Sequence, residues 1–168
     1  MHVFLLPALR AVFPDLKVIH IVRDGRDVVE SFSRVFKEEL TPLARHWVDA
    51  VRAAQAFGAP HPAQYLELRY EELVRQPRIS MQSVATFLDI AFDERMLRHH
   101  ELDLRLGDVE RRAHLQGVRQ PVCQASIGRW RTALDARQIK DLERVLGPTL
   151  AALGYDAGES PPRLAKSP

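Results

Sequence analysis

The sequence predicts an α/β fold in which a parallel sheet is flanked by helices. Two short apolar segments, residues 17–22 and 64–69, are each followed at once by a helical pattern. Strands of this kind are buried on both faces, as they are in a parallel sheet. Two strands do not form a stable sheet alone. We therefore expect a helix-rich and incomplete sheet of about two strands, whose further strands come from a missing segment or from a partner.

The helices follow from the spacing of apolar residues. The expected helices cover residues 3–13, 24–36, 42–57, 70–74, 79–88 and 136–153. Asp24 is the expected N-cap of the second helix, because its side chain can accept a bond from a free backbone N–H. On that helix, four apolar residues at helical spacing are expected to face the sheet: Val28, Phe32, Val35 and Phe36. Residues 101–124 break the pattern and predict a long irregular loop.

Composition excludes several classes of protein. The net charge is only +2, so no nucleic-acid partner is expected. No apolar run reaches the ~20 residues that a membrane span requires, and no signal peptide is evident. Cys123 is the one cysteine, so no disulfide forms within the chain. This fits a reducing compartment, and we expect a cytoplasmic protein.

The most concentrated chemistry lies where the first strand ends. Arg23 follows the strand directly, and Ser31 lies two turns into the next helix. Ligands of open α/β sheets bind at the carboxyl ends of the strands, so a guanidinium and a hydroxyl there can converge on an anion. The alternative is that Arg23 pairs with Asp27 or Glu30 and that Ser31 bonds a helix carbonyl. Spacing alone leaves both interpretations open.

The pattern Arg23-Asp24-x-x-Asp27-x-x-x-Ser31 resembles the 3′-phosphate-binding motif of sulfotransferases that use 3′-phosphoadenosine 5′-phosphosulfate (PAPS). The resemblance implies a P-loop NTPase-like fold. It also implies that Arg23 and Ser31 hold the 3′-phosphate of PAPS or of its product, 3′-phosphoadenosine 5′-phosphate (PAP).

Two later segments extend the resemblance. Residues 68–74 (LRYEELV) resemble the family's strand-to-helix RYEDLV element, which implies that Tyr70 lies against the adenine. Residues 126–131 (SIGRWR) resemble the S-x-G-R-W element of bacterial and tyrosylprotein-type members. This implies that Ser126 and Arg129 close over the nucleotide, whereas Trp130 packs. The loop before this element, including Arg119, would cover the nucleotide.

One part of the family's pattern is not found. No Gly-rich loop for the 5′-phosphosulfate is present, and neither is the usual His or Glu base, so no catalytic residue is assigned. The resemblance therefore implies that residues 1–155 are the C-terminal part of a sulfotransferase domain, followed by a disordered tail over 156–168. We expect this chain alone to bind PAP weakly or not at all, and to transfer little or no sulfate.

Partners and competing functions are less tightly constrained by the sequence. No metal is expected, because His99, His100 and His114 lack supporting carboxylate or cysteine ligands. The acceptor is of unknown class among carbohydrates, small alcohols, phenols and peptide tyrosines, and the oligomeric state stays open.

Three further residues carry expectations. His20, in mid-strand, is expected to be a satisfied core histidine, and His46 with Trp47 is a candidate lining of the acceptor pocket. The competing functions are an inactive nucleotide-binding or interaction module and a P-loop kinase-like remnant.

Overall fold

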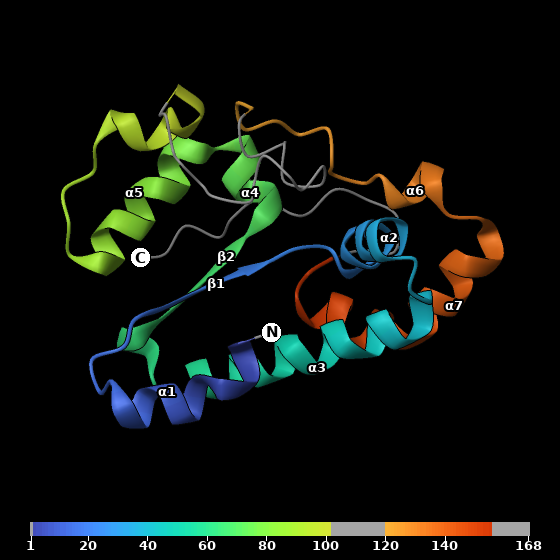
Figure 1. Cartoon of the computed structure of the whole chain (residues 1–168), viewed down its shortest axis with the longest axis horizontal. Helices are drawn as coiled ribbons and strands as arrows, with labels where there is room; N and C mark the ends of the chain where they lie inside the picture. The colour runs from blue at the N-terminus through green and yellow to red at the C-terminus, as the bar shows by residue number, and fades with distance from the viewer. Residues whose placement is uncertain (1, 102–119, 156–168) are drawn as a thin grey trace. The chain divides into compact units, whose positions relative to one another are not determined.

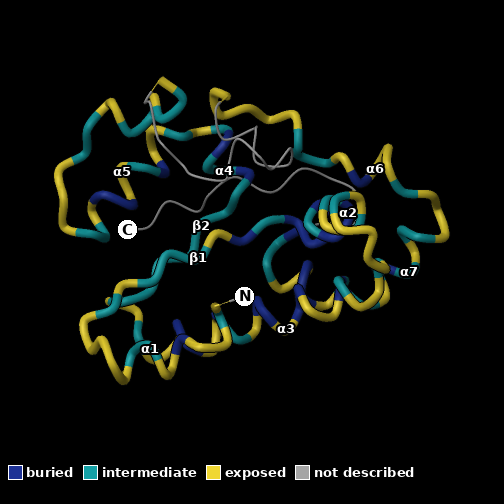
Figure 2. The backbone as a smooth tube through the Cα atoms, viewed as in Figure 1, coloured by how far each residue is buried: buried dark blue, intermediate teal, exposed yellow. Residues whose placement is uncertain are grey.

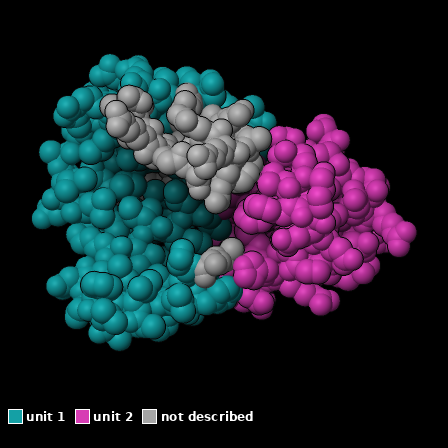
Figure 3. Space-filling view, in the orientation of Figure 1, with its two compact units in different colours: residues 1–22, 54–127 teal, residues 23–53, 128–168 magenta. Residues whose placement is uncertain are grey.

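The computed structural model describes residues 2–101 and 120–155 (Figure 1). Arg119, most of the expected irregular loop and the expected tail lie outside the described residues. The chain divides into two compact units, shown in Figure 3. The strand unit comprises residues 1–22 and 54–127, and the helical unit comprises residues 23–53 and 128–168.

The strand unit is built on two parallel strands, β1 (Val18–Val22) and β2 (Tyr65–Arg69) (Figure 1). Val18 pairs with Tyr65 and Val22 pairs with Arg69, so the two strands end together. This pairing confirms the expected α/β class with two parallel strands. Within each strand alternate residues share one face of the sheet.

The strand unit also contains helices, and the three predicted segments that lie in it, residues 3–13, 70–74 and 79–88, are helical over most of their length. The helices of this unit are the 3₁₀ helix η1 (His2–Leu5), α1 (Leu6–Val12), η2 (Pro62–Gln64), α4 (Tyr70–Arg75), α5 (Pro77–Leu88), η3 (Glu94–Leu97) and η4 (His99–Glu101). Helix α5 begins two residues earlier than expected. Proline is favoured in the first turn because its missing N–H would have no helical partner there. The residue that seemed to end one helix therefore starts the next.

The helical unit contains α2 (Gly25–Phe36), most of α3 (Leu40–Gly58), α6 (Trp130–Ala133) and α7 (Ala136–Ala152). Helix α2 contacts both α6 and α7. The side chains buried in this unit include Val29, Trp47, Val51, Trp130, Leu142, Leu146 and Leu150. Helix α7 begins with a capping box in which Asp135 and Gln138 each accept a bond from the other's backbone N–H. The expected helix over residues 136–153 is confirmed.

The expectation for the apolar face of α2 is wrong. Phe32 and Phe36 are 43% and 52% exposed, and their rings contact each other with centroids 5.5 Å apart. Val28 and Val35 are only partly buried. The buried residues of α2 are instead Gly25, Arg26, Asp27, Val29 and Glu30 (Figure 2). Charged residues can occupy a buried face when each charge has a partner there, and Arg26, Asp27 and Glu30 all have such partners.

Gly25 is required by the close approach of a tryptophan. A Cβ atom at this position would lie 2.9 Å from Cδ2 and Cε3 of Trp47. We expect Gly25→Ala to lower the free energy of unfolding, measured by urea titration, by about 1–3 kcal/mol, the usual effect of overpacking. In a Trp47→Leu background the same substitution should have a smaller effect, because the indole is gone. An equal effect in both backgrounds would contradict the steric explanation.

Candidate functional site

The turn between β1 and α2 is held by charged side chains. Asp24 caps α2 as expected, and its Oδ1 accepts a hydrogen bond from the backbone N–H of Arg26 at 2.9 Å. The same carboxylate accepts bonds from Arg26 Nε at 3.0 Å and from Arg26 Nη2 at 2.8 Å. Arg26 is only 2% exposed. A bidentate ion pair of this kind is strong and directional, so it fixes the position of the first turn of α2.

Arg26 also connects the turn to the second half of the chain. Its guanidinium carbon lies 4.1 Å from the ring centroid of Trp130, and the guanidinium carbon of Arg131 lies 4.6 Å from the ring centroid of Trp130. These are cation–π contacts, in which the ring's electron density attracts a cation. Trp130 is 5% exposed. The indole is therefore packed, as expected, and the structure places it against Arg26 at the start of α2.

Asp27 makes the most informative contact in the helical unit. Its Oδ2 accepts a hydrogen bond from the backbone N–H of Gly128 at 2.7 Å, and its Oδ1 accepts one from Trp130 at 3.1 Å. Nη2 of Arg23 lies 3.8 Å from the same Oδ2. Burial raises the pKa of Asp27, while the two N–H donors and Arg23 lower it. One buried carboxylate thus joins two of the sequence motifs, 101 residues apart at Gly128.

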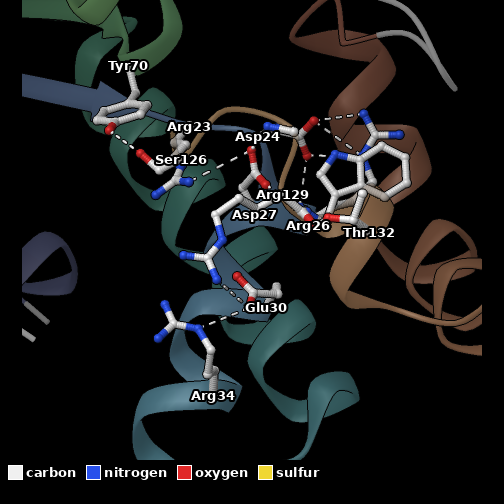
Figure 4. Close-up of polar contacts among 12 residues, drawn as sticks. Arg23, Asp24, Arg26, Asp27, Glu30, Arg34, Tyr70, Ser126, Arg129 and Thr132 are labelled. Atoms are coloured by element: carbon white, nitrogen blue, oxygen red, sulfur yellow. Dashed lines mark hydrogen bonds and ion pairs between the residues drawn. The ribbon is translucent and has the colours of Figure 1, made fainter. Parts of the chain in front are cut away.

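Glu30 binds two further arginines one turn along α2. Its Oε1 accepts a hydrogen bond from Nε of Arg34 at 3.1 Å and lies 3.8 Å from Nη2 of Arg129 (Figure 4). The Glu30 side chain is only 6% exposed, whereas that of Arg129 is 43% exposed. Arg129 is therefore anchored at an acidic residue and keeps a solvent-facing surface.

The five predicted site residues fall into two groups, each of which lies within one unit. Arg23, Ser31 and Arg129 belong to the helical unit, and Tyr70 and Ser126 belong to the strand unit. Tyr70 Oη and Ser126 Oγ share a hydrogen bond of 2.8 Å (Figure 4). The structure thus brings the RYEEL and SIGRW elements together at these two side chains.

The structure also bears on whether Arg23 and Ser31 can bind an anion or form contacts within the chain, which their spacing left open. The Arg23–Asp27 ion pair is present, as the alternative predicts. Glu30 contacts Arg34 and Arg129. Ser31 is partly buried, and among the described residues its hydroxyl makes no hydrogen bond, to a helix carbonyl or to any other group.

Three buried charges of α2 have roles that the sequence does not reveal. Arg26, Asp27 and Glu30 connect α2 to the Gly128–Trp130 segment. The sequence motif contains Asp27, and the spacing suggests Asp27 or Glu30 as a partner of Arg23, but neither observation predicts this connection. A further signal was the density of opposite charges in the run from Arg23 to Glu30. Charges that alternate so closely suggest ion pairing, but the pattern does not name the backbone amides of residues 128 and 130 as partners.

A second polar cluster lies on β1 and β2 in the strand unit. Nδ1 of His20 lies 2.7 Å from Tyr65 Oη and 3.1 Å from Glu67 Oε2, and the tyrosine hydroxyl donates to that carboxylate at 2.9 Å. His20 is therefore a satisfied histidine, as expected. The hydrogen bond from His20 is the largest cause of the lowered pKa of Glu67, and burial together with Glu67 raises the pKa of Tyr65.

The Glu67 cluster predicts a pH-dependent stability. The folded-state pKa of Glu67 lies below its ordinary value of 4.5, so its contribution is present above that pH and is lost as pH falls through the folded value. We expect Glu67→Gln to lower the free energy of unfolding at pH 7 by about 1 kcal/mol, and the deficit to shrink below pH 4.5. Urea titrations at several pH values measure it, with the exposed Glu38→Gln as control. A deficit that grows on acidification would contradict the assignment.

The two residues expected to line the acceptor pocket differ in burial. Trp47 is buried at 7% exposure, and its indole lies against Gly25 in the helical unit. His46 is exposed. A role of either residue at an acceptor stays a prediction.

Metal-binding side chains do not gather in the described part of the chain. Within residues 2–101 and 120–155, no group of three or more His, Cys, Asp or Glu side chains is arranged to hold a metal ion. In the same ranges, no helix has the length and apolar character needed to cross a membrane.

Comparisons with known proteins show which family this chain is similar to. A model described as the sulfotransferase family matches residues 1–94, more than half of the chain. Protein-tyrosine sulfotransferase A of Caenorhabditis elegans is 30% identical over 172 residues, covering 94% of this chain and 44% of that protein. A putative protein-tyrosine sulfotransferase of Caenorhabditis briggsae is 28% identical and covers 94% of this chain and 59% of its own length. The chain thus spans about half the length of these relatives.

A solved structure shows the same fold. The sulfotransferase domain from the curacin biosynthetic pathway superposes with a TM-score of 0.74 at 21% identity, and the match covers 92% of this chain and 60% of that one. The α/β architecture is therefore that of a sulfotransferase domain, as the three motifs imply. With the family model matching the segment that contains Arg23, Ser31 and Tyr70, the chain belongs to the sulfotransferase family.

Proposed function

We propose that this chain carries the 3′-phosphate- and adenine-binding half of a PAPS-dependent sulfotransferase. In its full-length form the protein transfers a sulfuryl group from PAPS to a hydroxyl or amine acceptor. The observation that carries the proposal is the contact of Asp27 with Arg23 on one side and with Gly128 and Trp130 on the other. Two segments that resemble nucleotide-binding motifs therefore meet within one unit.

The chemistry of a nucleotide 3′-phosphate suits the residues of the helical unit. A phosphate carries up to two negative charges, and guanidinium groups bind it through paired N–H donors. Arg23 and Arg129 supply the guanidinium groups, and the Ser31 hydroxyl supplies a further donor. The first turn of α2 adds the partial positive charge of a helix N-terminus. These groups together favour a phosphomonoester over an uncharged ribose hydroxyl.

The strand unit supplies the proposed contact with the base. Tyr70 begins α4 directly after β2, and its hydroxyl is held by Ser126. A ring fixed in this way offers a flat surface on which an adenine can stack. The proposal assigns Tyr70 to the adenine and Ser126 to the segment that closes over the nucleotide.

Sulfuryl transfer requires groups beyond these. Donor and acceptor must be held in line, and charge on the transferring oxygens must be stabilised. Backbone N–H groups of a Gly-rich loop do this well, and no such loop is present in this sequence. We therefore propose that this chain binds the nucleotide weakly and transfers little sulfate alone. The names of the relatives make a peptide tyrosine the first acceptor to test with the full-length protein.

Calorimetric titration of this chain with PAP, 5′-AMP, ATP and ADP tests the proposal. We expect PAP to bind more tightly than 5′-AMP, because only PAP carries the 3′-phosphate. Equal binding of ATP and PAP would favour the kinase-like alternative, and equal binding of PAP and 5′-AMP would contradict the assignment of the 3′-phosphate to this chain. Rapid sulfation of an acceptor by this chain alone would contradict the assignment of transfer to another segment.

A further inference from the structure

We propose that Asp27 is a positioning residue, which holds Arg129 beside Arg23 so that the two arginines act on one phosphate. This inference rests on the proposed function, because it assigns Arg23 and Arg129 to the nucleotide. It adds a role for a buried acid that itself has no reason to touch an anionic ligand. The proposed role of Asp27 is to set the distance between the guanidinium groups of Arg23 and Arg129, which lie far apart in the sequence.

The geometry around Asp27 fixes Arg129 from both sides. The N–H of Gly128, just before Arg129, donates to Oδ2 at 2.7 Å, and the N–H of Trp130, just after it, donates to Oδ1 at 3.1 Å. The peptide units that flank Arg129 are therefore both anchored on α2. Oδ2 also lies 3.8 Å from Nη2 of Arg23. A single carboxylate thus sets the position of the Arg129 backbone relative to the Arg23 guanidinium.

Glu30 contacts the side chain of Arg129, whose backbone is held by Asp27. Its Oε1 lies 3.8 Å from Nη2 of Arg129. Glu30 follows Asp27 by three residues, so the two acids lie on neighbouring positions of one helix face. Arg129 is therefore held at its backbone by Asp27 and at its guanidinium by Glu30, while 43% of its side chain stays exposed to solvent.

A carboxylate is the side chain that this role requires. Each of its oxygens accepts hydrogen bonds, so both N–H groups are satisfied at once. An asparagine of the same shape has one accepting oxygen and one donating NH₂ group, which would face the N–H of Gly128 or of Trp130. Asp27 is also 1% exposed. An unsatisfied donor in such a place would push the Arg129 segment away from α2.

A purely electrostatic role of Asp27 and a positioning role of Asp27 predict opposite effects of Asp27→Asn on PAP binding. The substitution removes a negative charge near Arg23, so a purely electrostatic effect would strengthen PAP binding. If Asp27 acts by positioning, the same substitution displaces Arg129 and weakens PAP binding. The direction of the change therefore decides between the two explanations.

The experiment measures the ratio of PAP affinity to 5′-AMP affinity in four chains: unsubstituted, Asp27→Asn, Arg129→Ala and the double variant. The ratio reports recognition of the 3′-phosphate and is insensitive to a loss of folded protein. We expect Asp27→Asn to lower the ratio about tenfold. Arg129→Ala should lower it by a similar factor, and the double variant should fall no further, because Asp27 acts through Arg129. Asp49→Asn, an exposed acid on α3, should leave the ratio unchanged.

Each outcome gives a decision. An unchanged or higher ratio in Asp27→Asn, or factors that multiply in the double variant, overturns the inference and leaves the proposed function intact. No preference for PAP in the unsubstituted chain overturns the proposed function, and the inference with it. If Asp27→Asn does not fold, the test is instead the amide hydrogen exchange of Gly128 and Trp130 in the unsubstituted chain, measured with and without PAP. PAP should then slow exchange at both amides, and unchanged exchange overturns the inference.

Discussion

Replacing Arg23 with alanine should remove most of the preference for PAP over 5′-AMP. A guanidinium bound to a phosphate contributes about 1.5–3 kcal/mol, so the affinity ratio should fall roughly 10- to 150-fold. Ser31→Ala removes a single hydroxyl donor, and the ratio should fall about three- to tenfold. The measurement is calorimetric titration with both nucleotides, since 5′-AMP lacks the group that these side chains are proposed to hold.

The matched control for Arg23 is another arginine of the helical unit. Arg45 is exposed on α3, so Arg45→Ala removes the same charge from the unit without touching the turn at β1 and α2. We expect the ratio to stay as in the unsubstituted chain. Equal losses in Arg23→Ala and Arg45→Ala would show that only the net charge matters, and the assignment of Arg23 would be wrong.

Replacing Trp130 with alanine should produce the largest loss of stability in the helical unit. Trp130 is 5% exposed and lies against the guanidinium groups of Arg26 and Arg131. Removing a buried aromatic side chain costs about 3–5 kcal/mol, because packing is lost and a cavity remains. That is a large fraction of the total stability of an ordinary domain, about 5–15 kcal/mol. Urea unfolding followed by circular dichroism measures the change.

An exposed aromatic of the same unit provides the comparison. Phe36 is 52% exposed at the end of α2, so Phe36→Ala should lower the free energy of unfolding by less than about 1 kcal/mol. The sequence interpretation, in which Phe36 faces the sheet, predicts a loss close to that of Trp130→Ala. Similar losses for the two variants would therefore contradict the burial that the structure assigns.

The elements themselves were predictable because their signals are local. Asp24 caps α2, the strands end where arginine follows an apolar run, and α7 ends before Gly154, whose φ is +70°. The error in α5, which begins at Pro77 rather than at residue 79, is also local. Proline ends a helix that it follows and favours the first turn of a helix that it begins, and spacing alone does not choose between these uses.

The buried face of α2 was not predictable by the same reasoning. Hydrophobic periodicity assumes that the apolar side of a helix is the buried one. In α2 the residues Arg26, Asp27 and Glu30 are buried, and Phe32 and Phe36 are exposed. The assumption fails because the partners of Asp27 are backbone N–H groups of Gly128 and Trp130. Backbone donors have no sequence signature, so their position is set only by the folded chain.

The candidate site likewise has a part that sequence motifs identify and a part that only the structure shows. Arg23, Ser31, Tyr70, Ser126 and Arg129 were identified from motifs, and their roles at a nucleotide stay predictions. The contact between Tyr70 and Ser126, and the anchoring of Arg129 by Glu30, came from the structure. Motifs identify residue types at fixed spacing, whereas side chains more than fifty residues apart meet only through the packing of the elements that carry them.

The sequence by itself determined the α/β class, the parallel strands, the longer helices to within three residues and the family, because each depends on short-range patterns of apolar, capping and motif residues. The tertiary structure alone decided which face of α2 is buried and which residues hold the Gly128–Trp130 segment. A charge is stable in a protein interior only when opposite charges or hydrogen-bond donors surround it. For Asp27 those donors come from the other end of the chain, so only the folded structure could place it.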